Sequence, residues 1–180
     1  MQQDSSLAIK SSVLVREWIF VLLGVVAIAI VFLPQNAATV AFWAWMFMFF
    51  AFATQVNMIL SGRRNKKFIS NGKSFENIVF THRLYARILT GFILAGVVGV
   101  EIAVRKVGGE WSLLTLIPHL ALSITAGVIL SFLLFRFTGL KDKERHWKFA
   151  YTFFACYSIA FFSGTYLLLE KFPLKELFAS

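Results

Sequence analysis

The sequence predicts an all-α integral membrane protein, a bundle of five transmembrane helices with a cytoplasmic N-terminus. Hydrophobic residues make up 58% of the chain and charged residues only 15%, a balance typical of membrane proteins and not of soluble domains. The apolar residues form long runs, and about 20 such residues cross a bilayer core. The 180 residues have room for one transmembrane domain over 1–180 with short loops, and no room for a soluble domain.

The first two helices come from one stretch without a charged residue, Trp18–Gly62. That stretch is too long for one span, and Pro34-Gln35-Asn36 interrupts it with residues that favour turns. We therefore expect helices over residues 17–33 and 38–60, followed by a polar basic loop over Ser61–Lys73.

Three further apolar runs predict the remaining helices, over residues 80–104, 111–136 and 146–169. The third helix contains Ala95 and Gly99, two small residues four positions apart, a spacing that lets another helix approach closely. Ordinary packing within the bundle accounts for this pair without any further role.

The basic residues predict the orientation. With the N-terminus inside, fourteen of the eighteen Lys and Arg residues fall on the cytoplasmic side, and only Arg105, Lys106, Lys171 and Lys175 fall outside. This positive-inside bias is strong, and with five helices it places the C-terminus outside. A pI near 10 in so hydrophobic a chain indicates contact with lipid headgroups and not with nucleic acid. We expect a multi-pass protein of a bacterial inner (plasma) membrane.

The three histidines are the strongest indication of function, because histidine is costly in lipid and can ligate metals or carry protons. With a rise of about 1.5 Å per residue, His82 and His146 both reach the cytoplasmic boundary of the bilayer. By the same rise, His119 lies roughly 12 Å below the outer surface and about 20 Å from the other two along the membrane normal. The three therefore cannot share one metal ion.

His82 and His146 face each other if the third and fifth helices pack side by side. Two imidazoles on facing helices are the usual way to hold a haem b in a bundle, with the haem iron as the metal. The neighbouring Arg83 and Arg145 can pair with haem propionates. The alternative is that both histidines are interfacial residues within basic loops, where histidine needs no special explanation.

Glu101 lies within about 5 Å of the outer end of the third helix, so we expect it to contact His119 across the third and fourth helices. Such a pair can handle protons, contribute to a metal or quinone site, or be a satisfied polar contact with no further role. Two ligands alone do not hold a bare metal ion. Gln55 and Asn57 are expected to bond neighbouring helices, and Cys156 is expected to be an inert packing residue.

Five short motifs carry a resemblance over about residues 80–170. They are His82-Arg83-Leu84, Pro118-His119-Leu120-Ala121-Leu122, Arg136-Phe137-Thr138-Gly139, Arg145-His146-Trp147 and Ser163-Gly164-Thr165-Tyr166-Leu167. In these motifs the chain resembles a bacterial five-helix membrane family of unknown function that includes an assembly factor for a-type cytochrome oxidase. More loosely, it resembles b-type membrane cytochromes with histidines on several helices.

The resemblance implies a role in the respiratory chain and respiratory-complex subunits as partners. A family member is expected to carry a further histidine near the outer end of the third helix, but residues 101–106 contain none. A second, outer bis-histidine haem is therefore not expected, and the inner pair is the better candidate.

Three functions follow from these observations. The first is electron transfer through one haem b on His82 and His146. The second is a non-catalytic assembly or accessory factor for a cytochrome oxidase or another respiratory complex. The third is a small channel or transporter module, which would need polar residues across the membrane such as Thr90, Thr125 and Ser158. No catalytic motif indicates an independent enzyme, so an oxidoreductase subunit is expected only if haem binds.

Overall fold

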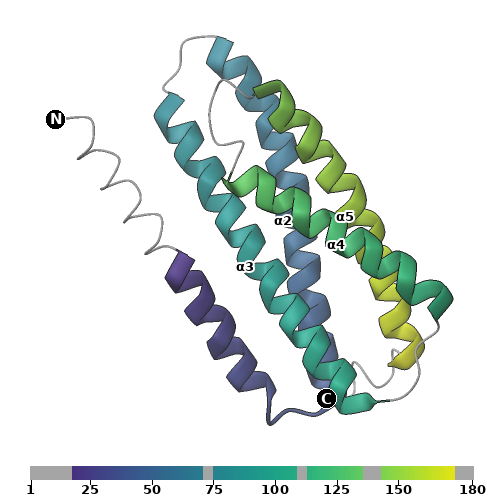
Figure 1. Cartoon of the computed structure of the whole chain (residues 1–180). Coiled ribbons are helices and arrows are strands. Elements are labelled where there is room, and N and C mark those ends of the chain that lie inside the picture. Colours follow the sequence, from purple (N-terminus) through teal and green to yellow (C-terminus); the bar gives the residue numbers. More distant parts are fainter. Residues whose placement is uncertain (1–17, 71–74, 109–112, 136–142, 173–180) are drawn as a thin grey trace.

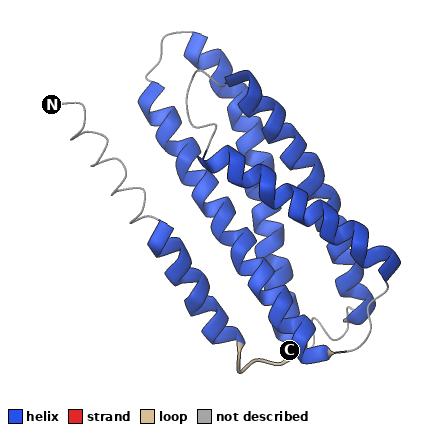
Figure 2. Ribbon diagram, viewed as in Figure 1, coloured by secondary structure: helices blue, strands red, loops and turns tan. Residues whose placement is uncertain are grey.

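A computed structural model of the chain describes residues 18–70, 75–108, 113–135 and 143–172. Every regular element within these ranges is a helix (Figure 2). The helices are Trp18–Phe32, α2 (Ala37–Ser70), α3 (Phe75–Val107), α4 (Leu113–Phe135) and α5 (Lys143–Lys171). They form an elongated bundle in which α4 runs obliquely to the other long helices (Figure 1).

Four of these helices are long and apolar enough to cross a membrane, and the Trp18–Phe32 helix is shorter. The four candidate spans are Ala37–Ser61, His82–Val107, Leu116–Leu134 and Arg145–Lys171. In the most apolar 18-residue window of each span, no more than 33% of the residues are buried inside the chain. The remaining apolar surface suits contact with lipid, and a helix satisfies its own backbone hydrogen bonds there. The fold therefore suggests a multi-pass membrane protein.

Three helices, α2, α3 and α5, extend beyond the apolar runs that predicted them. The largest difference is at the end of α2, which continues to Ser70, so most of the loop expected over Ser61–Lys73 is helical. Its sequence explains the extension: Arg and Lys are good helix formers, and cations near a helix C-terminus interact favourably with the helix dipole. Residues 71–73 of the expected loop lie outside the described residues.

The turn between the first two helices forms where Pro34-Gln35-Asn36 predicted it. The Thr39 backbone N–H donates to Asn36 Oδ1 at 2.8 Å, so the Asn36 side chain caps the start of α2. At the same end of the bundle, α3 stops at Gly108, whose φ of 63° belongs to the left-handed region that glycine adopts at helix ends.

α3 approaches α2 closely, because its facing surface carries small residues. A Cβ atom added to Gly99 would lie 2.8 Å from Ala44 Cβ, and one added to Gly96 would lie 2.8 Å from the Met48 side chain. Ala95 on the same helix is 1% exposed. The small-residue spacing of this helix therefore serves packing, the simpler of its possible roles.

The remaining helices pack around this pair. α5 contacts both α4 and α2, so α2 lies between α3 and α5. A core that includes Leu89, Ile129, Phe153 and Tyr157 joins α3, α4 and α5 to Ala51 of α2. We call the end of the bundle that holds His82 and His146 the His82 end, and the opposite end, where α3 finishes, the Lys106 end.

Candidate functional site

The structure brings His82 and His146 together at the His82 end. The centroids of the two imidazole rings lie 5.8 Å apart, and the ring planes are inclined at 64°. His82 belongs to α3 and His146 to α5, and both side chains are half-buried. The fold brings these two positions side by side although 64 residues separate them in the chain.

The donor set at this pair suits a haem better than a bare metal ion. No group of three or more His, Cys, Asp or Glu side chains gathers at one point within the described residues. A bare metal ion needs at least three protein ligands, whereas a porphyrin supplies four nitrogens to its iron and leaves two axial positions. Two histidines on different helices are a donor set that haem iron takes in helix bundles, so by their chemistry these two residues would hold the group.

Positive charge accompanies the pair. Arg83 and Arg145 are the chain neighbours of the two histidines, and both side chains are exposed at the His82 end. Guanidinium groups bind carboxylates in bidentate geometry, so Arg83 and Arg145 would hold the propionates of a haem bound at this pair.

His119 lies elsewhere, against α5 in the Lys106 half of the bundle. Its Nδ1 atom lies 3.0 Å from Ser163 Oγ, and Ser163 Oγ lies 3.1 Å from the carbonyl oxygen of Ala160. The serine has one hydroxyl proton, and its bond to the Ala160 carbonyl uses that proton, so we expect the imidazole proton of His119 on Nδ1.

Gly164 makes room for the His119 ring. A Cβ atom at Gly164 would lie 2.7 Å from Cε1 of the imidazole, a distance that real Cβ contacts do not reach. Ser163 and Gly164 were noticed in the sequence only as part of a motif. A hydroxyl residue next to a glycine on one helix can accommodate a polar side chain of another helix. The sequence shows this pair of residues, but it does not say which helix packs against them.

The expected contact between Glu101 and His119 is replaced by other contacts. Glu101 Oε1 forms an ion pair with Arg105 Nε at 2.6 Å on the same helix, and both side chains are exposed. His119 faces α5 because α4 packs against α5. The proton-handling, metal and quinone roles that required the Glu101–His119 pair therefore lose their geometric basis.

Gln55 differs from its expected role. Its side chain is only 3% exposed, yet neither amide atom has a hydrogen-bond partner among the described residues. Asn57, expected to behave similarly, is exposed.

Other polar contacts between helices were missed in the sequence. Trp45 Nε1 donates to Thr165 Oγ1 at 3.2 Å, and the Tyr157 hydroxyl donates to the Met48 carbonyl oxygen at 3.1 Å.

Comparison with protein families, with curated proteins and with solved structures finds no match to this chain.

Proposed function

We propose that the protein is a haem b-binding electron-transfer subunit of a respiratory chain in a bacterial inner membrane. His82 and His146 are the axial ligands in this proposal. The observation that carries it is the 5.8 Å separation of two imidazole rings contributed by different helices. The bound haem would supply one-electron chemistry at its iron.

The surroundings of the pair support this proposal in two ways. Both histidines stand at the first residues of candidate spans, His82–Val107 and Arg145–Lys171, so they lie at one membrane face. Arg83 and Arg145 are at that same face, where propionates meet water. By the positive-inside bias this face is cytoplasmic, and an electron carrier there would exchange electrons near the cytoplasmic surface.

The first test is an absorption spectrum of the protein, purified after expression with ample haem supply. Wild type is expected to show a Soret band and sharp α and β bands on reduction. His82→Ala and His146→Ala are expected to lose them, whereas His119→Ala, the matched control away from the pair, keeps them. A colourless wild-type preparation would contradict the proposal.

The second candidate, an assembly or accessory factor, would use the exposed apolar sides of the helices, which suit lipid and another membrane subunit alike. Leu113, Leu114 and Ile124 of α4, for example, are at least 66% exposed. Co-purification of respiratory-complex subunits with a haem-free protein would select this function over the first.

The channel alternative gains no support from the hydroxyl residues that it would need. Thr90, Thr125 and Ser158 each donate to a backbone carbonyl of their own helix, four residues earlier, at 2.7–2.8 Å. Hydroxyls bonded in this way lie along separate helices and build no continuous polar pathway within the described part of the chain. Flux through proteoliposomes that His119→Ala abolishes would restore this alternative.

A further inference from the structure

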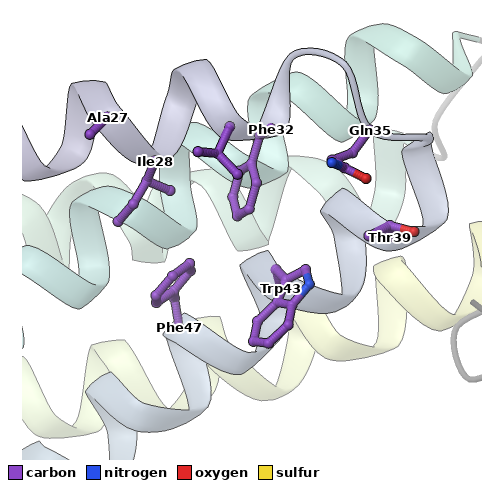
Figure 3. A pocket seen from close by; sticks show the side chains of 8 residues that line it. Ala27, Ile28, Phe32, Gln35, Thr39, Trp43 and Phe47 are labelled. Carbon is purple, nitrogen blue, oxygen red and sulfur yellow. The ribbon is translucent and has the colours of Figure 1, made fainter.

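A groove of about 480 Å³ lies between the Trp18–Phe32 helix and α2 (Figure 3). Ala27, Ile28 and Phe32 line it from the first helix, and Phe47 lines it from α2. Ala27 is exposed and Val31, also in the lining, is 60% exposed, so the groove opens sideways from the bundle. In a membrane that side faces lipid.

The groove changes from apolar to polar along its length. Its lining from Ala27 to Phe32 is apolar, and Gln35 and Thr39 close it at the Lys106 end (Figure 3). Trp43, which is 47% exposed, also lines the groove, and indole rings favour the boundary between lipid tails and headgroups. With a rise of about 1.5 Å per residue, the helical part of this lining, from Ala27 to Phe32, runs for roughly 8 Å along the groove.

A cation stands at the polar end. Lys106 Nζ, from the end of α3, donates to the Leu33 carbonyl oxygen at 2.7 Å, which fixes the ammonium group beside the turn that closes the groove. An ammonium group has three N–H donors, and this bond uses one. The Lys106 side chain is exposed, so the other donors face the headgroup region.

The shape and charge select one kind of occupant. A single hydrocarbon chain is far thinner than a helix of about 10 Å diameter, and it can lie along an apolar groove of this volume. The fixed ammonium at the headgroup end adds a preference for negative charge. We propose that the groove binds one acyl chain of an anionic phospholipid, with its phosphate on Lys106.

The test measures lipid that stays bound after purification in mild detergent, by native mass spectrometry of protein loaded with phosphatidylglycerol or phosphatidylcholine. Ala27→Trp fills the groove and is expected to lower bound phosphatidylglycerol at least tenfold. Ala121→Trp makes the same change on an exposed face of α4 and is expected to leave it unchanged. Should Ala27→Trp fail to fold, Val31→Trp fills the same groove from a side chain that is 60% exposed.

Charge is tested separately. Lys106→Gln is expected to reduce the preference for phosphatidylglycerol over phosphatidylcholine about fivefold, the factor that one lysine near anionic headgroups contributes. Arg105→Gln removes a neighbouring charge that is paired with Glu101 and serves as the control.

Equal lipid retention in both tryptophan variants would overturn the proposal. So would recovery of a neutral quinone from the groove, or a wild-type dimer that Ala27→Trp converts to monomer.

Discussion

The imidazole of His119 and the bare backbone of Gly164 fit together because glycine has no Cβ. Gly164→Ala would place that atom 2.7 Å from Cε1 of the ring and push the ring away from Ser163. We expect a loss of about 1–3 kcal/mol in the free energy of unfolding, the usual cost of overpacking. Gly127→Ala is the control, since nothing lies within 4 Å of its added Cβ and alanine favours a helix. Thermal unfolding in detergent compares the two, and equal midpoints would contradict this packing.

Ser163→Ala removes the acceptor of the His119 Nδ1–H bond and leaves a half-buried donor without that partner. The expected loss is about 1–2 kcal/mol. Within the described residues, the Ser158 hydroxyl bonds to the Phe154 carbonyl of its own helix, so Ser158→Ala is expected to cost less. Nitrogen-15 NMR of the histidine ring reports the tautomer directly. Wild type should show the proton on Nδ1, and a proton on Nε2 would contradict the assignment.

The buried side-chain amide of Gln55 has no hydrogen-bond partner for its oxygen or its nitrogen among the described residues. Gln55→Met replaces this amide by an apolar side chain of similar length. Because an unsatisfied buried polar group costs about 1–3 kcal/mol, this substitution is expected to raise stability by an amount in that range. Thr90→Val, at a buried residue whose hydroxyl is bonded to the Ala86 carbonyl, is expected to bring no such gain. A lower melting temperature in Gln55→Met would contradict this prediction.

Gly99→Val tests the close approach of α3 to α2. The new side chain meets Ala44 and Phe32, with its Cβ 2.8 Å and 3.0 Å from their nearest side-chain atoms, so we expect a loss of at least 1 kcal/mol. Gly24→Val introduces the same side chain where nothing lies within 4 Å, and it should be tolerated. Unfolding midpoints in detergent measure both variants, and similar values would show that the helices can move apart without cost.

The positions of the helices follow from hydropathy, because a bilayer demands apolar runs of a set length. Their ends do not, because a helix continues past the lipid when the next residues are good helix formers, as at the end of α2. The turn at Pro34-Gln35-Asn36 was predictable from its own side chains, since Asn36 caps the helix that follows.

The two predicted pairs of site residues fared differently for a physical reason. Rise per residue gives the depth of a side chain but not the direction in which it points around the helix. His82 and His146 share a depth and also face each other, with ring centroids 5.8 Å apart. Glu101 was expected to contact His119, but it forms an ion pair with Arg105 of its own helix. His119 instead lies within hydrogen-bond distance of Ser163 on α5.

The measurement that tests the central proposal most directly is electron paramagnetic resonance of the oxidised protein, purified after expression with ample haem. Ligation by two histidines predicts a low-spin ferric signal with one haem per chain. His82→Ala and His146→Ala should each abolish it or convert it to a high-spin signal, whereas His119→Ala retains it. A haem-free wild-type protein, or a low-spin signal unchanged in both inner variants, would contradict the account.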